Sequence, residues 1–170
     1  MKLFILGYMG SGKSTIGLLL AQKMQYNFID LDVYIENKTK KTITEIFNIE
    51  GETKFRELEK QYLSEVINEE NTVVALGGGT TCFNNNMDII NQSGTSIYLE
   101  MDAETLMERL STAKNNRPLI QNLNKAELKK FIKATLEKRT PIYNQANIII
   151  KANKINKEGL VKMIIKKITA

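Results

Sequence analysis

Short apolar runs and helical patterns alternate along the 170 residues of this chain. The apolar runs predict five β-strands, over residues 3–6, 27–32, 72–76, 95–101 and 148–151. Apolar residues at helical spacing predict helices over residues 14–24, 104–110, 128–136 and 160–168. Strands that alternate with helices are typical of a parallel sheet with crossover helices. We therefore predict an α/β fold over residues 1–170, one domain whose five-stranded parallel sheet is flanked by helices.

Two further helices are predicted between the second and third strands. Thr42 and Glu45 have the spacing of a capping box, and the apolar residues after Thr42 predict a short helix that ends near Gly51. A longer helix follows, with one apolar stripe at Phe55, Leu58, Tyr62 and Val66. A simple crossover needs only one helix, so the extra length over about residues 33–67 predicts a substrate-facing helical insertion.

A polar stretch over about residues 111–124 separates two of the predicted helices after the fourth strand. It contains Arg117 followed by Pro118, among lysine and asparagine residues. We interpret this stretch as a mobile lid.

The residues from Gly7 to Thr15 fit the pattern G-x-x-x-x-G-K-[ST] of a phosphate-binding loop. They stand between a predicted strand and a predicted helix, a context that favours this interpretation over a simple Gly/Ser turn. The backbone N–H groups of such a loop and the N-terminus of the helix suit a di- or triphosphate. Lys13 would reach the β- and γ-phosphates, and the Ser14 hydroxyl would bind Mg²⁺. The predicted nucleotide-binding residues are Gly10, Ser11, Gly12, Lys13, Ser14 and Thr15.

The composition of the chain limits its expected partners and the residues that can transfer protons. The net charge is 24 − 19 = +5, and the lysines are scattered in pairs without interleaved aromatic residues, so we expect no nucleic-acid partner. No apolar stretch is long enough to cross a bilayer, and Cys82 is the only cysteine, so we expect a cytoplasmic protein without a membrane partner. The chain has no histidine, so proton transfer must use Asp, Glu, Lys, Tyr or water.

Asp30 and Asp32 stand at the end of the predicted second strand, two residues apart, so both can face one crevice at the carboxyl edge of the sheet. One would face a metal and the other an acceptor; the alternative is a helix-capping or turn acid. The third strand ends without an acid, which favours Asp30 as the metal ligand. The run from Gly77 to Gly79 that follows this strand is either a loose turn or a point of close ligand approach.

Three arginines stand out from the lysine-rich background: Arg56, Arg117 and Arg139. A guanidinium offers a planar fork to carboxylate or phosphate. Singly, each arginine is expected to be a solvated surface charge. Together with a phosphate-binding loop, they form a candidate set for binding anionic substrates.

In this combination the sequence resembles the shikimate kinases, a P-loop family similar to the nucleoside monophosphate kinases. The resemblance covers nearly the whole chain and rests on Gly10–Thr15, Asp30-Leu31-Asp32, Phe55-Arg56, Gly77-Gly78-Gly79, Arg117-Pro118-Leu119 and Arg139 with Tyr143. Many members carry Ser or Thr just before the triple glycine. Ala75-Leu76 offers no hydroxyl at this place, so a water contact to the metal is expected to be rearranged.

The resemblance implies transfer of the γ-phosphoryl group of ATP to the 3-hydroxyl of shikimate, with Mg²⁺ as cofactor and the chain acting as a monomer. Asp32, Arg56, Gly78 and Arg139 would bind shikimate, the two arginines at its carboxylate and Asp32 at the accepting hydroxyl. Arg117 would close over the ATP phosphates with the lid. The implied catalytic residues are Lys13, Asp32 and Arg117, and the implied metal ligands are Ser14 and Asp30.

Without the resemblance, the residues predict only a P-loop phosphotransferase that acts on a small, anionic hydroxyl compound. A gluconate-type kinase and a nucleotide kinase remain open as alternatives, as does a regulatory nucleotide-binding module without catalysis. The chain contains no N-K-x-D motif, which argues against a GTPase.

Overall fold

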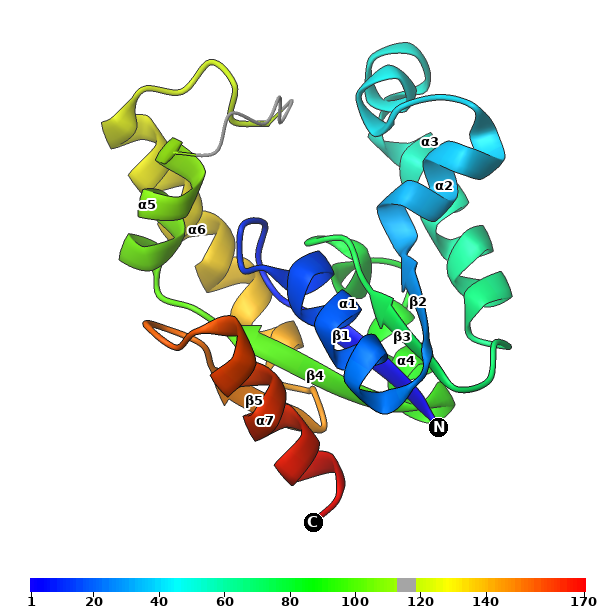
Figure 1. The fold of residues 1–170 in the computed structure, drawn as a ribbon. Helices are drawn as coiled ribbons and strands as arrows, with labels where there is room; N and C mark the ends of the chain where they lie inside the picture. Colours follow the sequence, from blue (N-terminus) through cyan, green and yellow to red (C-terminus); the bar gives the residue numbers. More distant parts are fainter. Residues whose placement is uncertain (113–118) are drawn as a thin grey trace.

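A computed structural model of the chain describes residues 1–112 and 119–170, and its strands form one parallel sheet (Figure 1). The strands are β1 (Lys2–Leu6), β2 (Asn27–Asp30), β3 (Thr72–Ala75), β4 (Thr95–Glu100) and β5 (Ile148–Lys151). Their order across the sheet is β2-β3-β1-β4-β5, and all four neighbouring pairs are parallel. The predicted fold class is therefore confirmed.

Helices cover both faces of the sheet. They are α1 (Lys13–Met24), α2 (Leu31–Thr39), α3 (Ile43–Val66), α4 (Asn86–Ser93), α5 (Ala103–Thr112), α6 (Lys125–Tyr143) and α7 (Lys157–Ile168). Successive side chains of β1 point to opposite faces, as the pleat requires. Leu3 and Ile5 belong to a core formed mainly with α1, α5, α6 and α7. Phe4 and Leu6 belong to a second core formed mainly with α2, α3 and α4. The sheet is thus buried between two helical layers.

Asp30 ends β2 and caps helix α2, an element that the sequence pattern did not predict. Its carboxylate accepts hydrogen bonds from the backbone N–H groups of Asp32 and Val33, at 3.1 and 3.3 Å. This capping satisfies N–H groups that have no partner within the helix. The expectation that Asp30 and Asp32 alternate on one strand is therefore wrong, because Asp32 lies in the first turn of α2.

The two helices predicted around Gly51 form one element, α3, with a kink. The capping box of Thr42 and Glu45 is present. Gly51 interrupts the helix with φ 84° and ψ 171°, in a region of backbone space that favours glycine. The rings of Phe47 and Phe55 lie 4.8 Å apart, centroid to centroid. Eight residues of a straight helix would separate them by about 12 Å along its axis, so the kink brings these two rings together.

The carboxyl edge of the sheet gathers the candidate residues. Strands β1 and β3 are neighbours, so the phosphate-binding loop after β1 lies beside the glycine run after β3. A Cβ atom placed on Gly78 would lie 3.2 Å from the backbone nitrogen of Met9. In Figure 1, α2 and α3 stand on one side of the phosphate-binding loop, and α5 with the upper part of α6 stands on the other. Two elements between β3 and β4 were not predicted: the 3-10 turn η1 (Thr80–Cys82) and helix α4.

Helices α2 and α3 occupy the range 33–67 of the predicted insertion, and its role in substrate binding stays a prediction. The predicted lid, 111–124, includes residues 113–118, which lie outside the described part of the chain. No helix among the described residues combines the length and apolar character needed to cross a membrane.

Candidate functional site

The phosphate-binding loop forms one wall of a cavity of about 370 Å³, which we call the P-loop cavity. Gly12 has φ 90° and is the N-cap of α1, so the helix starts directly at the loop. This left-handed backbone is one that glycine adopts without strain. The Lys13 ammonium is tied back to the loop, since Nζ donates to the Tyr8 carbonyl at 3.0 Å. The predicted residues that line this cavity are Gly10, Gly12, Lys13, Ser14, Thr15, Asp30, Asp32 and Gly78.

Ser11 is the one predicted nucleotide-binding residue of the loop that does not line the P-loop cavity. Its backbone N–H donates to the Tyr8 carbonyl at 3.1 Å, and its side chain is buried. Its hydroxyl has no hydrogen-bond partner among the described residues. In this structure Ser11 supports the turn, and its contact with a nucleotide stays a prediction.

Ser14 and Asp30 lie together, as expected for two ligands of one cation. The Ser14 hydroxyl donates to one carboxylate oxygen of Asp30, and the other carboxylate oxygen caps α2. Mg²⁺ prefers oxygen ligands and is usually bound through one or two protein groups, phosphate oxygens and water. One hydroxyl and one carboxylate beside a phosphate-binding loop fit this pattern. No group of three or more acidic, histidine or cysteine side chains that could hold a metal alone occurs in residues 1–112 and 119–170.

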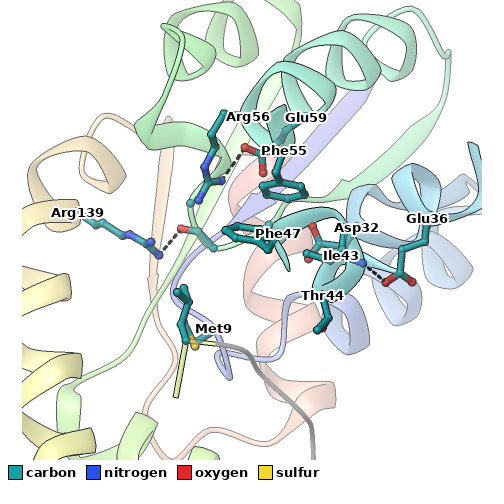
Figure 2. A pocket seen from close by; sticks show the side chains of 14 residues that line it. Met9, Asp32, Glu36, Ile43, Thr44, Phe47, Phe55, Arg56, Glu59 and Arg139 are labelled. Atoms are coloured by element: carbon teal, nitrogen blue, oxygen red, sulfur yellow. Dashed lines mark hydrogen bonds and ion pairs between the residues drawn. The ribbon is translucent and has the colours of Figure 1, made fainter. Parts of the chain in front are cut away.

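A second cavity, of about 310 Å³, contains both described candidate arginines, and we call it the arginine cavity (Figure 2). The predicted residues on its wall are Asp32, Arg56, Gly78 and Arg139. Phe47 and Phe55, the pair joined by the kink in α3, also line it, as does Leu119. The two cavities share Met9, Asp32 and Gly78. A molecule in one cavity can therefore meet a molecule in the other at Asp32.

Asp32 has an unusual proton affinity at this junction. Burial, the largest cause, and the nearby carboxylates of Asp30 and Glu59 together raise its pKa from 3.8 to about 6, while Lys13 acts in the opposite direction. A carboxylate with a pKa close to neutrality is suited to accept a proton in catalysis. The position and the raised pKa together make Asp32 the candidate general base.

Arg56 is held firmly on the wall of the arginine cavity. Its Nη1 donates to Glu59 at 2.8 Å, and its Nε and Nη2 donate to Glu52 at 3.4 and 3.2 Å. The guanidinium carbon lies 4.1 Å from the centroid of the Phe83 ring. A guanidinium has five N–H groups, so one donor on each terminal nitrogen is left for a ligand. Two such donors match the two oxygens of a carboxylate. The expectation that Arg56, taken singly, is a solvated surface charge is wrong.

Arg139 reaches the cavity from α6 and is anchored on the glycine run. Its Nη1 donates to the Gly78 carbonyl at 3.1 Å, and the hydroxyl of Tyr143, one turn later on α6, donates to the same oxygen. Burial raises the pKa of Tyr143, so its hydroxyl keeps the proton that this hydrogen bond requires. The carbonyl of Gly78 is thus fixed by two donors from one helix.

Of the three glycines after β3, Gly77 and Gly79 leave room for functional side chains, and Gly78 lies against the backbone of the phosphate-binding loop. A Cβ on Gly77 would lie 2.9 Å from Thr80 Oγ1 and 3.0 Å from Asp32 Oδ1. A Cβ on Gly79 would lie 2.7 Å from the Nη2 atom of Arg56. Real Cβ atoms almost never lie closer than 3.0 Å to another atom, so the Thr80 hydroxyl or the Arg56 guanidinium would have to shift. The run lets the backbone approach the chain's own polar groups, a role that neither sequence interpretation of the run included.

Sequence reasoning missed two residues of the site. Glu59, fully buried beside Arg56, lines the arginine cavity; its i,i+3 spacing from Arg56 on a helix was the available signal. Arg109 lines the P-loop cavity and donates to the Gly10 carbonyl at 3.4 Å. Arg117 lies outside the described residues, and its role over the phosphates stays a prediction.

Two solved structures similar to this one are both shikimate kinases. The crystal structure of shikimate kinase from Bacteroides thetaiotaomicron has a TM-score of 0.95 at 40% identity and covers 100% of this chain and 99% of its own. The shikimate kinase from Acinetobacter baumannii, solved in complex with shikimate, has a TM-score of 0.91 at 33% identity, covering 99% and 92%. A gluconokinase from Sinorhizobium meliloti has a TM-score of 0.59 at 14% identity, which shows a shared fold alone.

Sequence comparison agrees with the structural one. The shikimate kinase of Azobacteroides pseudotrichonymphae is 45% identical over 168 residues, covering 98% of this chain and 99% of that protein. The family model described as shikimate kinase matches residues 9–169, a range that includes the candidate residues on both cavities. The chain therefore belongs to the shikimate kinase family.

Proposed function

We propose that this chain transfers the γ-phosphoryl group of ATP to the 3-hydroxyl of shikimate, which gives shikimate 3-phosphate and ADP. The observation that carries the proposal is the junction of the two cavities at Asp32, with a phosphate-binding loop on one side and two anchored arginines on the other. Phosphoryl transfer depends mainly on positioning and electrostatic stabilisation of the reacting groups. The junction supports both, because donor and acceptor meet at a single carboxylate.

On the donor side, the loop N–H groups and Lys13 bind the phosphates of ATP. Ser14 and Asp30 would hold Mg²⁺, which would supply positive charge beside the phosphates when bound. The Lys13 ammonium stabilises the negative charge that develops on the γ-phosphoryl oxygens during transfer.

On the acceptor side, the two free donors of Arg56 and the guanidinium of Arg139 bind the carboxylate of shikimate. This contact orients the ring so that the accepting hydroxyl meets Asp32. Asp32 then accepts the hydroxyl proton as the oxygen attacks phosphorus. Above a pH of about 6 the Asp32 carboxylate is ionised and ready for this step.

Changing the two arginines to lysine tests the acceptor assignment. Lysine keeps the charge but lacks the planar fork, so Arg56→Lys and Arg139→Lys should each raise the KM for shikimate by about 10- to 100-fold, with kcat changed little. The measurement is steady-state kinetics with shikimate varied at saturating ATP. The matched control is Lys138→Ala, which removes an exposed cation next to Arg139 on α6 and should leave the KM unchanged.

A substrate analogue separates this assignment from its alternatives. A shikimate analogue without the carboxylate should be a much poorer substrate for the wild type, and the Arg56→Lys/Arg139→Lys double variant should discriminate less between the two compounds. Equal use of both compounds by the wild type would refute the arginine assignment and favour a gluconate-type acceptor. Absence of any turnover with ATP and shikimate would favour a non-catalytic nucleotide-binding module.

A further inference from the structure

Glu59 is a buried carboxylate that the proposed reaction does not use directly. Its side chain is 1% exposed, and each of its two oxygens accepts a hydrogen bond from another side chain. Oε2 accepts from Arg56 Nη1 at 2.8 Å, and Oε1 accepts from the hydroxyl of Thr80 at 2.6 Å. A buried charge is stable only when its oxygens are paired and hydrogen-bonded. The orientation of the carboxylate beside Arg56 therefore depends on the Thr80 hydroxyl.

Thr80 is itself fixed on all its polar atoms. Its backbone N–H donates to the Gly77 carbonyl at 3.2 Å, and its carbonyl accepts from the Asn86 side-chain amide at 2.9 Å. Both Thr80 and Asn86 have no exposed surface. Thr80 does not line the arginine cavity, so any effect on a ligand must act through Glu59. These contacts fix Thr80, the first residue of η1, against the glycine run and the first residue of α4. The sequence pattern predicted neither η1 nor α4.

We propose that Thr80 is a positioning residue for shikimate binding: its hydroxyl, held against Glu59, fixes the carboxylate that aims Arg56 into the arginine cavity. Glu52, the other partner of Arg56, is 56% exposed and is therefore free to change its conformation. Glu59 is the rigid partner, and its rigidity comes from Thr80. This inference rests on the proposed function, because the substrate whose carboxylate meets Arg56 is shikimate.

The test replaces Thr80 with valine, which keeps the shape of the side chain and removes the hydroxyl. Without the hydroxyl, Oε1 of Glu59 is a buried acceptor that lacks its donor. The free-energy cost of this state is enough to shift Glu59 and with it Arg56, so the KM for shikimate should rise about tenfold. Because Arg56 binds the carboxylate in ground and transition states alike, kcat and the KM for ATP should stay within about twofold of the wild type. Thr80→Ser keeps the hydroxyl and should restore the wild-type KM. A purely structural role of Thr80 would lower kcat and affect both substrates.

Thr81→Val is the matched control, since Thr81 is also buried and its hydroxyl contacts only the Cys82 sulfur, at 3.9 Å, among the described residues. It should leave the KM for shikimate unchanged. If Thr80→Val does not fold, Thr80→Ala removes the same hydroxyl without the bulk of valine. Any of three results would overturn the proposal. The KM for shikimate could stay unchanged in the variant without the hydroxyl, Thr80→Ser could fail to restore it, or Thr81→Val could raise it equally.

A crystal structure of Thr80→Val, or of Thr80→Ala, tests the inference independently of the substrate. The distance between Arg56 Nη1 and Glu59 Oε2 should be longer than the 2.8 Å observed here. An unchanged ion pair would overturn the inference, whichever acceptor the enzyme uses. If the wild type instead fails to phosphorylate shikimate, the proposed function fails, and this distance still decides the role of Thr80.

Discussion

Replacing Lys13 with methionine should lower kcat by about 10²- to 10³-fold while the protein stays folded. Methionine keeps the length of the apolar stem and removes the ammonium group. That group donates a hydrogen bond to the Tyr8 carbonyl at 3.0 Å and lies at the wall of the P-loop cavity. Its loss removes positive charge where negative charge develops during transfer. The measurement is the rate of ADP formation with ATP and shikimate.

Lys23→Met is the control for this variant, because Lys23 lies in the last turn of the same helix and is exposed. It should keep wild-type kinetics. Circular dichroism and thermal unfolding of both variants would show whether the fold is intact. A Lys13→Met enzyme that retains more than half of the wild-type kcat would rule out the assigned role of the ammonium.

Replacing Asp32 with asparagine should lower kcat by about 10²- to 10⁴-fold, the range of a general base. Asparagine has nearly the same shape, so the KM values for shikimate and ATP should change much less than kcat. The measurement is kcat at pH 8, where the wild-type carboxylate is ionised. A decrease in kcat of less than about threefold would mean that another group, or water, accepts the proton.

The same variant should be more stable than the wild type at alkaline pH. The folded-state pKa of Asp32 is raised from 3.8 to about 6, so the folded protein holds this proton more tightly than the unfolded chain. The free energy of unfolding of the wild type therefore falls as pH rises from about 4 to about 6 and stays lower above that. The cost is at most about 3 kcal/mol, because the side chain lines a cavity where water screens part of it.

Urea unfolding of metal-free protein in a chelating buffer would measure this difference. Asp32→Asn should gain stability over the wild type at pH 8 and little or none at pH 4, since asparagine does not ionise. Asp88→Asn is the matched control, because Asp88 also lies in the first turn of a helix but is exposed. It should show no gain that grows with pH. An Asp32→Asn variant that is less stable than the wild type at pH 8 would contradict the raised pKa.

Local patterns were enough to predict the fold and to place the phosphate-binding loop between a strand and a helix. The phosphate-binding loop combines a fixed motif with a preceding strand and a following helix, so the sequence places Lys13 and Ser14 directly. Strands β1 and β5 were predicted at or within one residue of their observed bounds, because short buried strands are uninterrupted apolar runs. These features depend on neighbours in sequence, which a single sequence contains.

The acceptor side of the site depends on tertiary contacts and backbone bends. The periodicity of apolar residues along the chain does not predict them. The capping role of Asp30 starts α2 and moves Asp32 from a strand into a helix. Glu59 is an unremarkable helical acid until η1 brings the Thr80 hydroxyl against it, 21 residues later in the chain. The pairing of Phe47 with Phe55 requires the kink at Gly51. These three contacts can be identified only in the folded structure.

Loops usually vary more in sequence than the elements they connect. The run from Gly77 to Gly79 is constrained in another way, because its members face three separate parts of the molecule: α2 with Asp32, the phosphate-binding loop at Met9, and α3 with Arg56. A side chain gained at any one position would need a compensating change on a different element. The side chains that this loop can accept therefore depend on three segments far away in the sequence.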